Sequence, residues 1–394
     1  MTDPSIEPAR AAVARSRRTV IKVGTRVLTD DDGRIALARF SGVVDAAARL
    51  RRRGVDVLVV SSGAVGLGRE ALGLPAVPDE LEERQACAAV GQGLLMSLYR
   101  EGFARLGLVC AQVLLTQGDF EHRTRYLNLR NTLTALLRRG AVPVINENDA
   151  VATEELAPAE GDTRRVFGDN DRLSALVAAE LDADLLVLLT DVDGVYDRDP
   201  RRDPGARLLA TVEDPGPGSG IVAGTGSAAG RGGMRSKLGA AAVASRAGCH
   251  AVIASGIDPT ALPRVLAGAE VGTWVPAGRG LAARRRWIAF AVAPRGVLHL
   301  DAGAVEAVRH RNASLLPAGV QRVEGNFAAG DVVELRGPNG DAVGRGVVLC
   351  DAATARRWCA GDPPDWIRNR HALVNRRHLA LEGYARAETE EVPR

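Results

Sequence analysis

Apolar runs of strand length alternate with longer amphipathic stretches along the first two-thirds of the chain. Short runs rich in Val, Ile and Leu predict strands, and stretches with apolar residues at helical spacing predict helices. The strands are predicted at residues 19–23, 55–61, 109–115, 141–146, 184–190 and 250–254. The helices are predicted at 36–53, 81–103 (interrupted by Gly91 and Gly93), 123–139, 172–181 and 234–246. This alternation predicts an α/β fold, an αβα sandwich in which helices cover both faces of a mostly parallel sheet.

The alternation stops near residue 276, where prolines and a cluster of arginines begin. Short β-type stretches follow at 296–300, 331–336 and 342–350, with a hairpin turn predicted at 338–340 (Pro-Asn-Gly). We therefore predict a flexible N-terminal tail over 1–18, an α/β domain over 19–277 and a linker over 278–294. Residues 295–394 are predicted to form a small, β-rich C-terminal domain.

The composition narrows the class of protein. Apolar residues make up 46% of the 394 and aromatics only 4%, so Ala, Val and Leu must build the core, as in parallel α/β folds. A net charge of +3 argues against a dedicated nucleic-acid binder. The five cysteines are scattered without a CxxC pair and predict reduced thiols. With no apolar run of membrane-helix length and no signal-peptide core, we expect a cytoplasmic protein that does not bind a membrane.

Lysine has been replaced almost everywhere by arginine. Of 51 basic residues only Lys22 and Lys237 are lysines, and both lie in glycine-flanked segments. A lysine ammonium is a compact point charge that fits between phosphate oxygens, whereas an arginine is a wide planar fork. The two surviving lysines therefore suggest a phosphate group held from both sides.

Polar segments follow three more predicted strands or open a predicted helix. They are residues 61–68 (SSGAVGLG), 146–149 (NEND), 168–171 (GDND) and 190–196 (TDVDGVY). Ligands collect at the carboxyl ends of parallel strands, so we expect these segments to share one site. In residues 61–68, the serine hydroxyls and the glycines, which allow a ligand to approach the backbone closely, suit binding of an anion. The amides and carboxylates of residues 146–149 and 168–171 suit binding of an amino group. Asp169 is also an ordinary helix N-cap.

Other phosphate and metal motifs do not fit. Residues 232–237 (GGMRSK) are not a P-loop, because no glycine precedes the lysine and no Ser or Thr follows it. The six histidines show no metal-ligand spacing, and we predict no protein-bound metal site.

In this order the segments resemble the amino acid kinase family, most specifically those members that phosphorylate L-glutamate. The resemblance rests on residues 142–151 (VPVINENDAV), 167–175 (FGDNDRLSA) and 232–237, and it spans about residues 19–383. Residues 190–196 are shared with members that act on aspartate or nucleoside monophosphates. The C-terminal domain is similar to PUA domains, through residues 312–319 and 325–327.

The resemblance implies a role for individual residues. Lys22 and Lys237 would contact the transferring phosphoryl group, and Asp171, with Asp169 alongside, would orient the two lysines. The residues expected to hold glutamate are Ser62, Asn146, Asp149 and Asn170. The residues expected to line the nucleotide are Lys22, Thr190, Asp191, Arg231, Gly232, Gly233, Met234, Arg235, Ser236 and Lys237.

The implied reaction is ATP-dependent phosphorylation of the γ-carboxylate of L-glutamate, the first step toward proline. ATP and Mg²⁺ are the implied cofactors, proline the implied feedback inhibitor, and a homo-oligomer (dimer or tetramer) the implied assembly. This sequence departs from the family in two places. Arg26 stands where the family commonly has serine, and the segment 154–167 is longer than in the shortest members.

Two other functions remain open from the sequence. An RNA-binding protein is one, because PUA-like domains often bind RNA and residues 279–394 hold 18 basic against 13 acidic side chains. Its arginines are dispersed and it lacks an evident aromatic stacking platform, so RNA is not the expected partner. A kinase of the same family with a different acceptor is the other. The amides and carboxylates at 146–149 and 169–171 favour a zwitterionic acceptor over a phosphorylated one.

Overall fold

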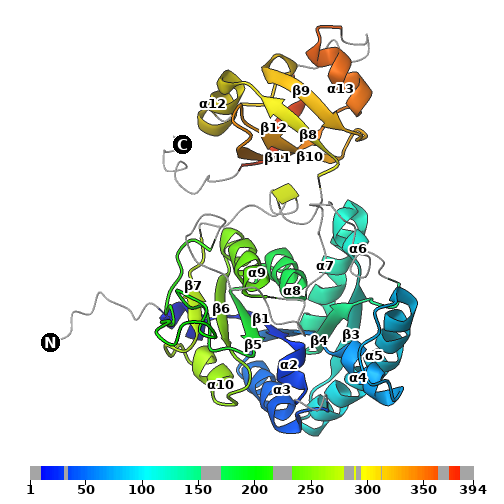
Figure 1. The fold of residues 1–394 in the computed structure, drawn as a ribbon, viewed down its shortest axis with the longest axis vertical. Coiled ribbons are helices and arrows are strands. Elements are labelled where there is room, and N and C mark those ends of the chain that lie inside the picture. The colour runs from blue at the N-terminus through cyan, green and yellow to red at the C-terminus, as the bar shows by residue number, and fades with distance from the viewer. Residues whose placement is uncertain are drawn as a thin grey trace, which may run out of the picture. The chain divides into compact units, whose positions relative to one another are not determined.

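The computed structural model describes residues 10–30, 34–151, 170–215, 233–278, 288–289, 294–311, 313–362 and 372–381. By its backbone contacts the chain separates into two compact units, Met1–Gly280 and Leu281–Arg394 (Figure 1). In the described part of the chain, no helix is both long enough and apolar enough to cross a bilayer.

The first unit is built on a seven-stranded sheet with the order β3-β4-β2-β1-β5-β6-β7. Its strands are β1 (Arg18–Val23), β2 (Asp56–Ser61), β3 (Cys110–Leu115), β4 (Val142–Glu147), β5 (Leu185–Thr190), β6 (His250–Ser255) and β7 (Thr273–Val275). Each neighbouring pair is parallel except β6 and β7, which are antiparallel. The predicted, mostly parallel sheet is confirmed.

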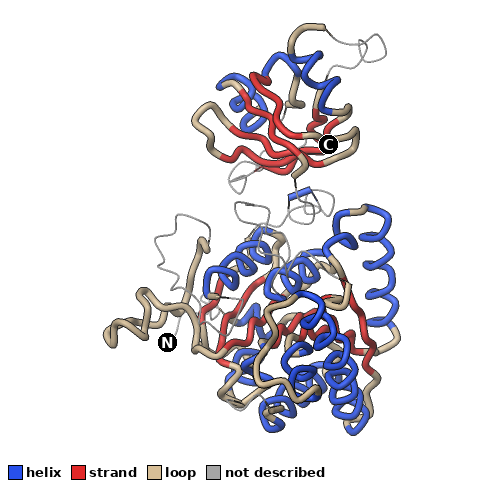
Figure 2. The backbone as a smooth tube through the Cα atoms, turned by 45° about the vertical axis from the view of Figure 1, so that its right-hand side comes forward, coloured by secondary structure: helices blue, strands red, loops and turns tan. Residues whose placement is uncertain are grey.

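Helices cover both faces of this sheet (Figures 1 and 2). They are α1 (Ala11–Ala14), α2 (Thr25–Leu28), α3 (Leu37–Arg52), α4 (Ala64–Ala71), α5 (Leu81–Arg105), α6 (Gln117–Glu121), α7 (Arg123–Arg138), α8 (Asn170–Glu180), α9 (Met234–Arg246) and α10 (Ala261–Leu266). Helices α7, α8 and α9 pack on one face, while α3 and α10 pack on the other. The arrangement is the predicted αβα sandwich.

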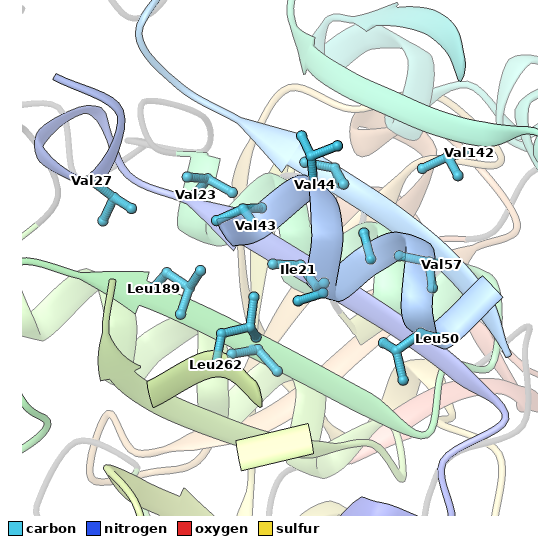
Figure 3. Packing of buried hydrophobic residues seen from close by; sticks show 14 of the residues in the cluster. Ile21, Val23, Val27, Val43, Val44, Leu50, Val57, Val142, Leu189 and Leu262 are labelled. Carbon is cyan, nitrogen blue, oxygen red and sulfur yellow. The ribbon is translucent and has the colours of Figure 1, made fainter. Parts of the chain in front are cut away.

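Alternate residues of the strands point to opposite faces, and this fixes where the core and the site lie. Ile21 and Val23 of β1 pack with Val43 and Val44 of α3 in a cluster of fully or nearly fully buried side chains (Figure 3). Lys22 lies between them in sequence and therefore points to the other face, toward α8 and α9.

The crossing of α4 and α5 is closer than ordinary side chains permit. A β-carbon added to Gly91 would lie 1.8 Å from the carbonyl oxygen of Ala64, and one added to Gly68 would lie 1.7 Å from that of Cys87. The sequence predicted an interruption at Gly91 and Gly93, but α5 runs continuously through both residues. At Gly91 the absence of a side chain serves close helix packing.

The prediction of a flexible tail up to residue 18 is wrong for residues 10–18. Arg10 is 5% exposed, and its guanidinium donates hydrogen bonds to carbonyl oxygens between β5 and β7. The acceptors are Ala210 (2.6 Å), Val271 (2.7 Å), Ala269 (3.2 Å) and Gly272 (3.2 Å). Helix α1 follows and packs against α10, so this segment belongs to the folded unit. Residues 1–9 lie outside the described part.

The described part of the second unit contains a five-stranded sheet with the order β12-β11-β10-β8-β9. Its elements are β8 (Gly296–Leu300), α12 (Ala302–His310), a 3-10 turn (Pro317–Gly319), β9 (Val320–Gly325), β10 (Val332–Arg336), β11 (Ala342–Val348), α13 (Ala352–Cys359) and β12 (Val374–Leu381). The predicted hairpin between β10 and β11 is confirmed, with Gly340 at φ +79° in its turn. Asp301 and Asp351 cap α12 and α13 through their carboxylates.

Candidate active site

The register of the parallel strands brings three of the predicted polar segments to one edge of the sheet. Lys22 of β1 pairs with Val60 of β2, and Ile145 of β4 pairs with the same Val60. Asn146 is therefore level with Ser61, one residue before Ser62. The predicted convergence of strand ends is observed for β1, β2 and β4.

Lys22, Asp171 and Lys237 meet although they are 149 and 66 residues apart. The Nζ atom of Lys22 lies 2.7 Å from Oδ1 of Asp171, and the Nζ atom of Lys237 lies 3.1 Å from Oδ2. Lys22 comes from β1, Asp171 from the first turn of α8, and Lys237 from the first turn of α9. Because α8 and α9 pack together over β1 and β5, their N-termini deliver the carboxylate and one ammonium to the end of β1.

The three side chains are almost entirely removed from water. Asp171 is fully buried, and the side chains of Lys22 and Lys237 are 5% and 7% exposed. Burial alone would raise the pKa of Asp171, but the two ammonium groups favour its charged form, and the pKa is lowered. Among these three side chains, two ammonium groups face one carboxylate in a setting that water barely reaches.

Three amides and a serine form a second cluster beside the lysines. Asn170 donates through Nδ2 to Oγ of Ser62 (2.9 Å) and to Oδ1 of Asn146 (3.1 Å). Asn146 in turn donates through Nδ2 to Oε1 of Gln92 (2.8 Å). Ser62, Asn146 and Asn170 are three of the four residues predicted to hold the acceptor. The fourth, Asp149, lies half-buried in the turn after β4.

Thr190 and Asp191 lie at the carboxyl end of β5, on the other side of β1. The hydroxyl of Thr190 donates to Oδ1 of Asp191 (3.1 Å), and Arg26 of α2 donates to Oδ2 (2.8 Å). Burial by itself would raise the pKa of Asp191, but the hydrogen bond from Arg26 and the other donors lower it. Arg26, singled out as a departure from the family pattern, therefore joins the loop after Lys22 to the predicted nucleotide segment.

The end of the predicted nucleotide segment forms the start of α9. Gly233 is the N-cap, and its carbonyl accepts from the backbone N–H groups of Ser236 (3.0 Å) and Lys237 (3.3 Å). Met234 is half-buried and Arg235 is exposed. Asp169, Arg231 and Gly232, which the sequence also assigned to the site, lie outside the described residues, as does segment 154–167.

Sequence reasoning missed two contributors, Gln92 and Tyr99, both on α5. The hydroxyl of fully buried Tyr99 donates to Oγ of Ser61 (3.0 Å), next to Ser62. Burial raises the pKa of this phenol well above its usual range, so it stays protonated. In the sequence, the available signal was a polar glutamine and a tyrosine within the predicted helix over 81–103. Their partners, Asn146 and Ser61, lie at strand ends far away in sequence, so this signal could not identify the contacts.

The arrangement suits transfer of a highly charged group to a small polar acceptor. Two ammonium groups fixed by one carboxylate can stabilise negative charge, and the adjoining amides can orient an acceptor. Within the described residues, no group of three or more His, Cys, Asp and Glu side chains is placed to hold a metal ion.

Comparison with known proteins identifies the families of the two domains. Residues 17–255 match the family model described as the amino acid kinase family, and residues 296–362 match that of the PUA domain. The chain is 48% identical to a glutamate 5-kinase of Myxococcus xanthus, over 90% of this chain and 92% of that protein. It is 47% identical to a glutamate 5-kinase of Chromohalobacter salexigens, over 89% of this chain and 90% of that protein.

Among solved structures, a UMP kinase from Bacillus anthracis covers 66% of this chain with 16% identity and a TM-score of 0.45, and this chain covers 96% of it. With the two family models and the long matches to glutamate 5-kinases, the chain belongs to the amino acid kinase family, in the group of the glutamate 5-kinases, and carries a PUA domain after its kinase domain.

Proposed function

We propose that the protein transfers the γ-phosphoryl group of ATP to the γ-carboxylate of L-glutamate, giving L-glutamyl 5-phosphate for proline synthesis. The main observation in support is the buried cluster of Lys22, Asp171 and Lys237. In it the carboxylate oxygens of Asp171 lie 2.7 Å from Nζ of Lys22 and 3.1 Å from Nζ of Lys237. The long matches to glutamate 5-kinases support the same reaction.

In this reaction an oxygen of the γ-carboxylate attacks the γ-phosphorus of ATP, and the bond to the bridging oxygen of ADP breaks. A carboxylate is ionised and nucleophilic at neutral pH, so no side chain has to remove a proton. The site must therefore position two anions in line and offset their charge. Lys22 and Lys237 supply the positive charge, and Asp171 keeps both ammonium groups in fixed positions.

The nucleotide would lie over β1 and β5, near Thr190, Asp191 and the first turn of α9. The N-terminus of α9 offers backbone N–H groups and the positive end of a helix dipole to phosphate oxygens. Mg²⁺ accompanies ATP in such transfers and neutralises phosphate charge. Phosphate oxygens would be its main ligands, because the carboxylates of Asp171 and Asp191 are paired with lysine and arginine side chains.

The acceptor would lie over β2 and β4, where Ser62, Asn146, Asp149 and Asn170 lie. Oδ1 of Asn170 is buried and has no hydrogen-bond partner among the described residues. A buried, unpaired acceptor is costly unless a ligand supplies the donor, and the ammonium of an amino acid is such a donor.

Proline carries a similar amine and carboxylate. We propose that it inhibits by competing for this subsite, which predicts competition with glutamate and not with ATP.

Trapping with hydroxylamine tests the reaction directly. The protein is incubated with Mg-ATP and hydroxylamine, and with L-glutamate, L-aspartate, N-acetylglutamate or no acceptor. We expect the hydroxamate of an acyl phosphate with L-glutamate only. ADP release without hydroxamate, or hydroxamate from N-acetylglutamate at an equal rate, would contradict the proposal.

A second measurement tests the division of the site. Asp149→Ala should raise KM for glutamate by far more than KM for ATP. The opposite result would mean that the two subsites have been assigned the wrong way round.

A further inference from the structure

The amide side chains of Gln92, Asn146 and Asn170 are joined in series. Each hydrogen bond runs in the same direction: Asn170 donates to Asn146 over 3.1 Å, and Asn146 donates to Gln92 over 2.8 Å. Asn146, in the middle, is only 2% exposed. The series therefore has a fixed polarity, with a different chemical group left over at each end.

The two ends of the series are opposite in kind. At Asn170 the amide nitrogen is used twice, toward Asn146 and Ser62, and the buried Oδ1 atom is an unpaired acceptor within the described residues. At Gln92 the oxygen is used, and the Nε2 atom makes no hydrogen bond to any described residue. One end offers a lone pair to a cation, and the other offers two N–H donors to an anion.

An α-amino acid carries this pair of charges at one end. The γ-carboxylate of glutamate must face Lys22 and Lys237 to receive the phosphoryl group, so the ammonium and the α-carboxylate remain for the amide series. We infer that Gln92 is a substrate-binding residue that donates through Nε2 to the α-carboxylate of the acceptor. The inference rests on the proposed function.

Asn146 determines which end of Gln92 faces the acceptor. If the Gln92 amide turned over, its NH₂ group would face the NH₂ group of Asn146, and a buried donor would lose its partner. The orientation of the Gln92 amide is thus fixed by Asn146, whose own amide orientation is fixed by Asn170. The close crossing of α4 and α5 at Gly91 places Gln92 next to the loop that holds Ser62.

The test pairs a change in the protein with a change in the substrate. Gln92→Ala and Gln92→Glu are assayed with L-glutamate and with its α-amide, isoglutamine, which keeps the γ-carboxylate but lacks the α-carboxylate. Hydroxamate formation and ADP release give kcat and KM for each acceptor and for ATP. Gln112→Glu, an exposed glutamine on β3 of the same unit, is the matched control for the added charge.

We expect Gln92→Ala to raise KM for glutamate about 10- to 100-fold, because a hydrogen bond to a charged group is lost, with KM for ATP unchanged. Gln92→Glu should raise it further, since a carboxylate would face the α-carboxylate. Isoglutamine should be used less well by the wild type, and neither substitution should reduce its use more than about threefold. Gln112→Glu should resemble the wild type.

Equal losses with both acceptors, or a matching rise in KM for ATP, would show that Gln92 only supports the fold and would overturn the inference. Gln92→Glu preserves the size of the side chain, so it serves if the alanine variant is unstable; thermal unfolding of each variant is recorded alongside. A wild type that forms no hydroxamate with glutamate would refute the proposed function itself. A normal wild type with unselective variants would refute only the role of Gln92.

Discussion

Replacing Asp171 by Asn removes the negative charge that lies between the ammonium groups of Lys22 and Lys237. The three side chains are 7% exposed or less, so water cannot take over the role of the carboxylate. Removing one partner of a buried ion pair costs about 3–5 kcal/mol. An asparagine oxygen can still accept from one lysine, and we therefore expect a loss near the lower limit, about 3 kcal/mol. The released lysines should also lower kcat by about 100-fold or more.

Urea unfolding and steady-state kinetics measure the two effects. Asp45→Asn is the matched control, because Asp45 forms an ion pair of the same 2.7 Å length with Arg49 on the surface of α3, with 44% and 72% of the side chains exposed. That pair should contribute only about 0.3–0.5 kcal/mol. If Asp171→Asn were no more destabilising than Asp45→Asn and kept most of its kcat, the assignment of Asp171 as the residue that holds both lysines would be refuted.

The destabilisation caused by Asp171→Asn should depend on pH in a direction that the pKa of Asp171 predicts. The pKa of Asp171 is lowered in the folded protein, so its contribution to stability is present above the unfolded pKa of about 3.9 and is lost as the pH falls through the folded pKa. The difference in unfolding free energy between wild type and Asp171→Asn should therefore shrink below about pH 4. A difference that grew with acidification would contradict the lowered pKa.

Four further substitutions have definite expected results. Lys237→Arg should lose most of kcat although the charge is kept, because a planar fork cannot replace a buried point charge; near-normal turnover would argue against a phosphate contact. Arg26→Ser should raise KM for ATP several-fold while KM for glutamate stays constant, since Asp191 loses its 2.8 Å partner; kinetics unchanged for ATP would separate Arg26 from the nucleotide. Gly91→Ala should destabilise by about 3 kcal/mol or more, because its β-carbon would meet backbone of α4 at 1.8 Å. Gly93→Ala, which meets nothing within 4 Å, should instead stabilise α5 by about 0.5–1 kcal/mol in the same unfolding assay.

The parts of the fold that follow from local pattern could be predicted from the sequence. Six strands of the first unit are predicted by their apolar runs, and parallel pairing then places their polar ends at one edge of the sheet. Asn146 follows one of these strands. Lys22 and Lys237 stand out as the only two lysines of the chain. The role of Asp171 is implied by the resemblance to the amino acid kinase family, and the structure brings its carboxylate to both lysines.

The parts that depend on contacts between distant segments could not be predicted. The sequence predicts a helix interruption at Gly91, because glycine weakens an isolated helix, yet in the structure this glycine permits two helix backbones to touch. Gln92 reaches Asn146 only because of that crossing. The sequence predicts a tail that includes Arg10, because residues 1–18 are rich in Arg, Ala and Pro and lack an apolar core. The acceptors of Arg10 are backbone carbonyls, which have no sequence signature.

The burial of Arg10 decides where a shortened version of the protein can begin. Its guanidinium contacts four carbonyl groups that belong to the connections around β7, the antiparallel strand at the margin of the sheet. A truncated form that starts at β1 would keep every strand but uncover those oxygens and the surface under α1. A domain boundary chosen from the strands alone would therefore remove Arg10 and its hydrogen bonds to the segments beside β7, the last strand of the kinase domain.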